Sequence, residues 1–277
     1  MQQLHLSKPF CDLWRQSDPF ERVKALQGDV LRAMKTRKTL RFHVNGGVYY
    51  VKMHGGIGWW EILKNLLQCK RPVIGAQNEW QALRRLHEIG VETMMPVAFG
   101  RRGHNPARME SFIITEELPG TRSLEDFCAN WPTTPPPSWL RRALIERVAS
   151  MVGRMHRHGL NHRDCYICHF HLRMPDAGTP LHPEQVHLYV IDLHRAQLRR
   201  RVPPRWRIKD LAGLYFSSMD IGLTRADCCR FIRAYEEQPL REVLRRRGRL
   251  WQRVASTAVA LYRKHFGVAP GKIHEIP

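Results

Sequence analysis

The sequence predicts an α+β fold in two lobes, a small strand-rich lobe at residues 1–117 and a larger helical lobe at 118–277. An Asn-Gly pair at 45–46 separates two runs that alternate apolar and polar residues, which is a strong hairpin signal. From about residue 139 the apolar residues recur with a helical period instead. With 277 residues, 43% of them hydrophobic, the chain can bury the core of one large domain or of two lobes.

The first lobe is predicted to contain a β-hairpin followed by a helix. The hairpin strands are expected at 39–44 and 48–53, so that Lys52 stands near the end of the second strand. The following helix is predicted over 77–89, where Gly90 ends it.

Glu79 is the notable residue of that predicted helix. Leu83 and Leu86 follow it by four and seven residues, which places the carboxylate on the apolar stripe. An unpaired buried charge is costly, so Glu79 either reaches out from the edge of the stripe or pairs with a cation. Lys52 is the cation that we expect to pair with it.

The residues after this helix predict a hinge and then the helical lobe. A short apolar strand at 111–115 leads into the sequence Glu-Glu-Leu-Pro-Gly, which suits a hinge between lobes. The elements expected beyond it are a helix start at 123–127, a helix at 139–158, a strand at 186–191 with Asp192 at its end, and helices from about 206.

The chain is strongly basic, with 45 Lys and Arg against 25 Asp and Glu and a net charge of +20. Such an excess favours a polyanionic partner. No run of about 18 apolar residues is present, so a membrane-spanning helix is not expected. The N-terminal residues lack the pattern of a signal peptide. We therefore expect a cytoplasmic protein whose seven cysteines are reduced thiols.

The stretch Asn161–Phe170, N-H-R-D-C-Y-I-C-H-F, fits two patterns at once. Cys165, Cys168 and His169 match the C-x-x-C-H signature of covalent haem attachment, whereas His-Arg-Asp at 162–164 matches a kinase catalytic loop. Haem attachment requires export, for which no signal is seen. Structural zinc usually takes ligand pairs from two separated segments, and only one is present here. Neither haem nor structural zinc is expected, and the two cysteines are interpreted as packing residues.

Four residues along the chain match the parts that phosphoryl transfer requires. A kinase holds the phosphates with a strand lysine, holds that lysine with a helix glutamate, orients the hydroxyl with a loop aspartate and binds magnesium with a further aspartate. The chain offers these in order as Lys52, Glu79, Asp164 and Asp192. Each has an ordinary alternative, since Asp192 can simply cap a turn. Their order and context together predict a protein-kinase-like fold that uses ATP and Mg²⁺.

Three departures from the common kinase pattern are evident. No glycine-rich loop precedes Lys52; if residues 28–34 are the first strand, the loop over the phosphates contains Lys35, Arg37 and Lys38. His169 stands where kinases have a metal-binding Asn, and it can bind metal, contact a phosphate or only pack. Asp192 is followed by Leu-His instead of Phe-Gly, so a regulated activation switch is not evident.

The sequence resembles the lipopolysaccharide core heptose(I) kinases, the WaaP (RfaP) family. The resemblance runs from about Pro9 to Lys264. It is carried by the stretches at 161–170, 190–199 (V-I-D-L-H-R-A-Q-L-R), 209–224 (K-D-L-A-G-L-Y-F-S-S-M-D-I-G-L-T), 18–30, 39–42 and 57–67.

This resemblance implies phosphorylation of the first heptose of the lipopolysaccharide inner core at its 4-hydroxyl, with ATP and magnesium. Asp164 would be the catalytic base, matching the family's His-Arg-Asp aspartate. From the kinase pattern we expect Asp192 to bind metal, with His169 as the second candidate ligand, and Glu117 and Leu118 to contact the nucleotide at the hinge. The family also implies tyrosine self-phosphorylation as a side activity, and acyl carrier protein as a partner whose acyl chain is buried in the kinase.

The basic residues then have a use in binding the acceptor, lipid A–core lipopolysaccharide. The expected anion-binding residues are Arg163, Arg199, Arg200, Arg201, Arg205 and Arg207, with Lys209 in the same cluster. A second cluster, at 245–249, adds charge that favours contact with the anionic leaflet of the inner membrane. Either cluster can also be an ordinary solvated face. Trp59 and Trp60 are expected to pack within the small lobe, in preference to entering the membrane.

Two other classes of function were weighed against a kinase. A nucleic-acid-binding module explains the charge but leaves the four-residue constellation unexplained, so nucleic acid is not expected as a partner. A pseudokinase scaffold that binds acyl carrier protein would keep its binding without Asp164 and would show no turnover.

Overall fold

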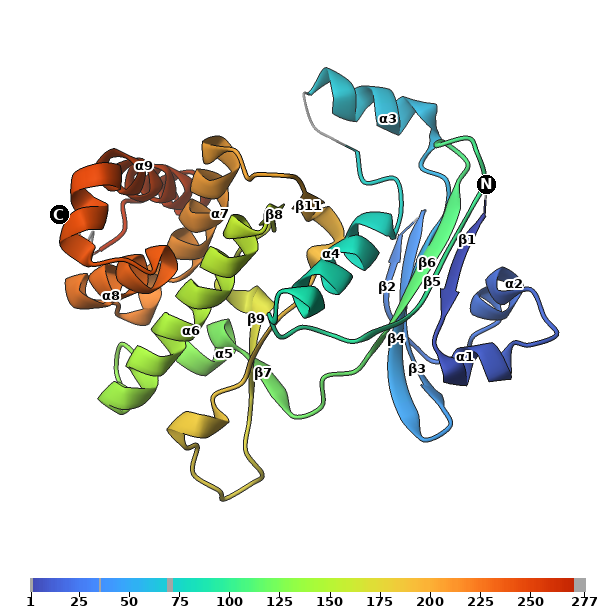
Figure 1. Ribbon diagram of the computed structural model, residues 1–277, viewed down its shortest axis with the longest axis horizontal. Helices are drawn as coiled ribbons and strands as arrows, with labels where there is room; N and C mark the ends of the chain where they lie inside the picture. Colours follow the sequence, from blue (N-terminus) through green and yellow to red (C-terminus); the bar gives the residue numbers. More distant parts are fainter. Residues whose placement is uncertain (1, 35, 69–71, 272–277) are drawn as a thin grey trace. The chain divides into compact units, whose positions relative to one another are not determined.

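The computed structural model describes residues 2–34, 36–68 and 72–271 (Figure 1). The chain forms two compact units. The first comprises residues 1–85, 94–118 and 193–195, and the second comprises 86–93, 119–192 and 196–277. The main boundary at 118/119 lies one residue from the predicted division, whereas the exchange of two short segments between the units has no counterpart in the prediction.

The first unit contains a six-stranded antiparallel sheet in the order β1-β5-β6-β4-β3-β2. Its strands are β1 (Gln3–Leu6), β2 (Asp29–Met34), β3 (Arg37–Val44), β4 (Gly47–His54), β5 (Pro96–Arg102) and β6 (Glu110–Glu116). The predicted hairpin is confirmed: Val44 pairs with Gly47, and both Asn45 and Gly46 have positive φ, at 48° and 78°. A two-residue type I′ turn requires this backbone and favours Asn-Gly.

Two expectations for this unit were wrong. Residues 29–34 are not the first strand, because β1 precedes them and pairs with β5 at the sheet edge. Arg37 and Lys38 are the first residues of β3 and pair with His54 and Met53, so they do not belong to a loop.

The helices of this unit are α1 (Lys8–Leu13), α2 (Pro19–Lys24), α3 (Gly58–Leu67) and α4 (Gln77–Glu88). They lie on the two sides of the sheet, except α3, which lies beyond one end of the strands (Figure 1). On one face, Phe10, Trp14 and Phe20 of the N-terminal segment pack with Phe42 and Val51 of the sheet in a buried cluster. The opposite face of β4 therefore presents Lys52 toward α4.

The tryptophans of α3 do not pack as expected. Trp59 is 54% exposed and Trp60 is 79% exposed, and Leu63, Leu66 and Leu67 of the same helix are exposed as well. Ile62 is the buried residue of α3. Along the described residues, no helix combines the length and apolar composition needed to cross a membrane.

The second unit is mainly helical. Its helices are α5 (Leu124–Cys128), α6 (Ser138–Arg157), α7 (Pro204–Ser217), α8 (Arg225–Glu236) and α9 (Leu240–Phe266). Short strands are β7 (Thr121–Ser123), β8 (Leu160–Asn161), β9 (Phe170–Arg173), β10 (Leu188–Val190) and β11 (Gln197–Leu198), and the 3-10 turns include Ile167–His169. The predicted helices at 123–127 and 139–158 are confirmed within one residue at each end, whereas the predicted strand at 186–191 is shorter. Gly159, with φ of 80°, ends α6 and starts the predicted catalytic loop.

Candidate active site

The first unit holds Lys52 and Glu79 together. The Nζ of Lys52 donates to Oε1 of Glu79 at 2.6 Å. The Lys52 side chain is 17% exposed and that of Glu79 is 1% exposed. Glu79 lies in the first turn of α4, at the helix end where the macrodipole favours a negative charge. The alternative in which Glu79 reaches into solvent is therefore wrong.

In the second unit, the loop at 161–170 is held by the buried carboxylate of Asp210 on α7. Its Oδ2 accepts the backbone N–H of His162 at 2.6 Å, and its Oδ1 accepts that of Arg163 at 2.9 Å. Arg163 has a φ of 74°, a conformation that costs energy outside glycine and persists only when its surroundings fix it. Asp210 therefore fixes the backbone immediately before the half-buried Asp164.

Asp210 is also bound to His156, the last buried residue of α6. The Nε2 of His156 lies 3.2 Å from Oδ2 of Asp210, and its Nδ1 lies 2.8 Å from the hydroxyl of Tyr235 on α8. All three side chains are almost fully buried. Sequence reasoning missed this network. The one residue in the sequence that could have indicated it is Asp210, in a stretch that was interpreted only as part of a helix.

His162 joins the loop to the strand end that carries Asp192. Its Nε2 donates to the carbonyl of Ile191 at 3.0 Å, and the N–H of Ile191 donates to the carbonyl of His169 at 3.0 Å. Burial lowers the pKa of His162, so the ring is neutral. Asp192 itself has a φ of 59°, so both Arg163 in the loop and Asp192 beyond β10 adopt a left-handed backbone.

His169 lies between the two predicted aspartates of this unit. Its Nδ1 lies 2.7 Å from the backbone carbonyl of Asp164, which can only accept, so Nδ1 carries the proton. The other nitrogen, Nε2, lies 3.7 Å from Oδ2 of Asp192. The ring also stacks on His162, with 5.5 Å between centroids. In its neutral form the imidazole therefore offers the Nε2 lone pair on the side of Asp192.

The cysteines of the loop behave as protonated packing residues. Cys165 is buried, and burial raises the pKa of its thiol well above the usual value. Burial likewise raises the pKa of Cys168 to about 11. Metal binding and covalent chemistry require thiolates, which these environments disfavour.

The structure limits how the other predicted nucleotide contacts could act. The carboxylate of Glu117 accepts two hydrogen bonds from Arg41, at 2.8 and 3.2 Å, and one from the hydroxyl of Tyr50 at 2.8 Å. Its side chain is thus engaged, and its backbone N–H donates to the carbonyl of Val48 at 3.0 Å. Leu118 ends the segment 94–118 of the first unit. Lys35 lies outside the described residues.

The structure brings three of the predicted acceptor-binding arginines together. Arg163, Arg199 and Arg205 all lie over the ring of Trp206, a residue that the sequence did not single out. The remaining predicted residues make no such ring contact within the described part of the chain: Arg200, Arg201 and Arg207.

The family of the chain follows from a match over most of its length. Residues 21–235 match the model of the lipopolysaccharide kinase (Kdo/WaaP) family. The chain belongs to this family. The family and the fold class predicted from the sequence are both confirmed.

Curated members of the Kdo/WaaP family align with nearly all of the chain. The lipopolysaccharide core heptose(I) kinase WaaP of Pseudomonas aeruginosa is 56% identical over 262 residues, which cover 95% of this chain and 97% of the relative. The enzyme of the same name from Escherichia coli is 53% identical, over 93% of this chain and 96% of the relative. A solved structure described as WaaP in complex with acyl carrier protein has a TM-score of 0.81 and 52% identity, covering 94% of this chain and 99% of that one.

Proposed function

We propose that this protein is an ATP-dependent lipopolysaccharide core heptose(I) kinase, which transfers a phosphoryl group to the 4-hydroxyl of the first heptose of the inner core. The observation that carries the proposal is the loop at 161–170, which Asp210 holds in place. In this loop His169 contacts the backbone carbonyl of Asp164 through Nδ1, and its Nε2 lies near the carboxylate of Asp192. This loop occurs in a chain that is more than half identical to kinases named for this activity.

Each site residue has a role in this reaction. Lys52, held by Glu79, would bind the phosphates of ATP, helped by Arg37 at the start of β3 and by Lys35 before it. Lys38 pairs with Met53, which packs on the other face of the sheet, so Lys38 is not part of this site. The backbone of Glu117 and Leu118 would contact the base. Asp164 would accept the proton of the heptose hydroxyl as the hydroxyl attacks the γ-phosphorus.

The donor set on the second unit fits a magnesium ion. The carboxylate of Asp192 is a preferred Mg²⁺ ligand, and Nε2 of His169, 3.7 Å away, can reach the same ion. Bound magnesium would neutralise charge on the phosphates during transfer. His169 also ties the loop to Asp164 through Nδ1, so metal binding and base position would depend on one side chain.

The acceptor carries phosphates and acidic sugars, and we propose that the arginine cluster binds them. Its members are Arg163, Arg199, Arg200, Arg201, Arg205 and Arg207. Guanidinium groups match oxyanions with paired hydrogen bonds, so these residues suit the acceptor better than lysines would.

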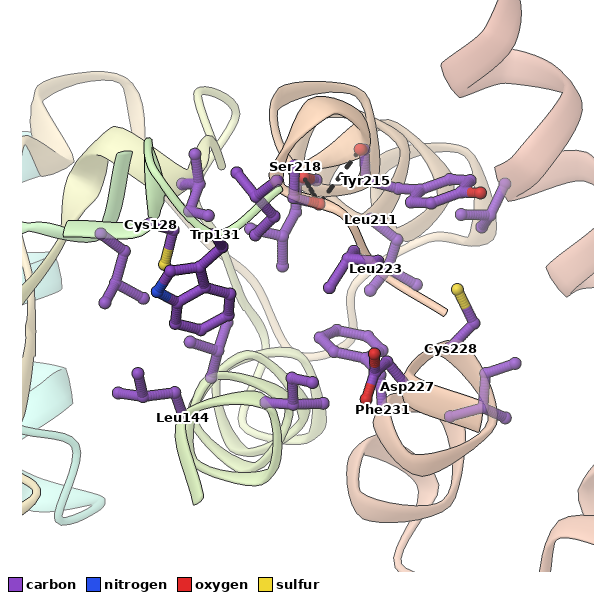
Figure 2. Close-up of a pocket in the computed structure, with 18 of the residues that line it drawn as sticks. Cys128, Trp131, Leu144, Leu211, Tyr215, Ser218, Leu223, Asp227, Cys228 and Phe231 are labelled. Carbon is purple, nitrogen blue, oxygen red and sulfur yellow. Dashed lines mark hydrogen bonds between the residues drawn. The ribbon is translucent and has the colours of Figure 1, made fainter. Parts of the chain in front are cut away.

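Acyl carrier protein is the proposed protein partner. The second unit contains an apolar cavity of about 110 Å³ between α5, α6, α7, α8 and α9 (Figure 2). Trp131 and Leu144 face it from one side, and Leu211, Leu223 and Phe231 line the other. Asp227 is the charged residue of the lining, and its carboxylate is paired with Arg141 at 2.7 Å. Such a lining suits the acyl chain of the carrier, while the +20 charge suits its acidic surface.

We also propose peripheral contact with the cytoplasmic leaflet of the inner membrane, where the glycolipid acceptor is found. The support is α3, on which Trp60 and Leu67 are the most exposed of five exposed apolar side chains. Tryptophan and leucine on one helix of a strongly basic protein are typical of binding to an anionic lipid surface.

The test is phosphate transfer from ATP to core lipopolysaccharide that lacks the heptose phosphate. The proposal predicts stoichiometric transfer that requires magnesium, with the phosphate located on the first heptose by mass spectrometry and ³¹P NMR. A protein that binds acyl carrier protein but transfers no phosphate would instead be a scaffold. Transfer to a different sugar would correct the acceptor while retaining the kinase chemistry.

A further inference from the structure

Trp206, in the first turn of α7, lies at the centre of four cationic side chains. Measured to the ring centroid, the guanidinium carbons of Arg163, Arg199 and Arg205 lie at 5.3, 5.6 and 5.4 Å. The Nζ of Lys209 lies at 4.8 Å. The four cations come from three separate segments of the second unit, so the fold and not local sequence assembles them.

This gathering of like charges creates a positive potential that attracts an anion. The face of an indole attracts a cation only modestly, and four cations around one ring repel one another. In the described part of the chain, no ion pair includes Arg205 or Lys209. The carboxylate next in sequence, Asp210, accepts the backbone N–H groups of the catalytic loop.

Two further observations point to an anion at this place. Arg205 and Lys209 belong to the first two turns of a 14-residue helix whose N-cap, Pro203, offers no side-chain hydrogen bond to the first amides. A helix N-terminus favours negative charge. The indole Nε1 of Trp206 is buried and has no hydrogen-bond partner among the described residues, so this donor of the ring is unsatisfied.

We propose that Trp206 and its four cations form a binding site for an oxyanion of the acceptor, a phosphate or a sugar carboxylate distinct from the group that receives the phosphoryl. The proposal rests on the proposed function for the identity of the acceptor. Because Arg163 directly precedes Asp164, an oxyanion bound here sets the position of the acceptor relative to the catalytic loop. The site thereby selects glycolipids that carry an acidic group at a fixed distance from the reacting hydroxyl.

Acceptor binding without nucleotide tests this site directly. The variants are Arg205→Ala, Lys209→Ala and the double variant, which should fold because neither side chain forms an ion pair among the described residues. Arg142→Ala, which changes an exposed arginine near the start of α6, removes one charge elsewhere and is the matched control for each single variant. We expect the double variant to weaken acceptor binding and raise the acceptor KM by about tenfold or more, with the KM for ATP unchanged. Binding equal to that of Arg142→Ala overturns the proposal.

Two modified acceptors identify the oxyanion. If the oxyanion is a phosphate, a dephosphorylated acceptor should bind wild type and the double variant equally. If it is a carboxylate, an acceptor whose carboxyl groups have been reduced should bind the two proteins equally. A difference between the two proteins that survives both treatments contradicts the site.

A simple probe separates this test from the proposed function. The ³¹P linewidth of inorganic phosphate, in magnesium-free buffer, should report binding to wild type and Arg142→Ala but not to the double variant. Equal broadening by all three proteins overturns the site. Wild type that binds phosphate through these residues but transfers none from ATP would contradict the kinase function alone.

Discussion

His169 hydrogen-bonds through Nδ1 to the backbone carbonyl of Asp164, at 2.7 Å, and thereby directs its Nε2 to the side of Asp192. One imidazole thus ties the proposed base to the proposed metal ligand. Common kinases place an amide at this position. A substitution at His169 should therefore change which metal ion best supports activity.

Replacing His169 should alter the metal dependence of the kinase. Imidazole suits softer transition metals better than magnesium, whereas an amide oxygen suits magnesium. His169→Asn should therefore raise the rate with Mg²⁺ relative to Mn²⁺, while His169→Ala should lower the rate with both by about tenfold or more. Steady-state rates at saturating metal measure the ratio. If His169→Asn keeps the wild-type ratio and His169→Ala keeps the wild-type rates, His169 is a packing residue.

The Lys52–Glu79 pair should be strongly coupled in stability. Lys52→Met leaves the nearly inaccessible Glu79 carboxylate without its cation, which should lower the free energy of unfolding by about 3–5 kcal/mol. Lys52→Met combined with Glu79→Leu should recover most of that loss, because no charge remains buried. Urea denaturation measures the free energy of unfolding of Lys52→Met, Glu79→Leu and the double variant, each relative to wild type. Losses that simply add would show that the pair is not coupled. Neither variant should bind ATP normally.

His54 should make the protein sensitive to acid. Burial, followed by the charges of Arg37 and Lys52, lowers the pKa of this histidine to about 3. The unfolded chain, with a pKa near 6.5, then binds more protons than the folded one between pH 6.5 and 3. Stability from this group is complete above pH 6.5 and falls by up to about 1.4 kcal/mol per pH unit below it. His54→Leu should flatten this part of the curve. If the free energy of unfolding of the variant falls with pH as steeply as that of wild type, His54 is not the source of the acid sensitivity.

The exposed face of α3 should bind anionic lipid. Trp60→Ser should weaken binding to vesicles that contain phosphatidylglycerol by about tenfold, since a large apolar side chain no longer enters the interface. Leu13→Ser, which changes an exposed leucine of α1, is the matched control and should bind as wild type does. Cosedimentation with vesicles provides the measurement. Equal binding by the two variants would remove α3 from the membrane contact.

Local patterns in the sequence predicted much of the fold. The Asn45-Gly46 turn was predictable because its backbone requires those residues, and the helical period placed Glu79 on the buried side of α4. The edge strand β1 was not predictable, because it pairs with β5 across more than 90 residues. Trp59 and Trp60 were misplaced because an apolar side chain does not reveal whether the fold supplies a partner to cover it.

The site was predictable where each residue has its own sequence context. Asp164 follows a helix stop, and Asp192 ends a strand, so both could be identified from the chain alone. Asp210 and Trp206 could not, since their meaning arises from contacts with a loop more than 40 residues earlier. His169 could be identified as a site residue, but its role could not be assigned, because its tautomer depends on the backbone carbonyl that it contacts in the fold.

The most direct test of the account is the rate of phosphate transfer to core lipopolysaccharide lacking the heptose phosphate, for wild type, Asp164→Ala and Asp192→Ala. Removal of a catalytic base typically costs about 10²–10⁴-fold. We predict that loss for Asp164→Ala with acceptor binding retained, and loss of magnesium-dependent turnover for Asp192→Ala. Equal transfer by all three proteins would contradict the active site proposed here.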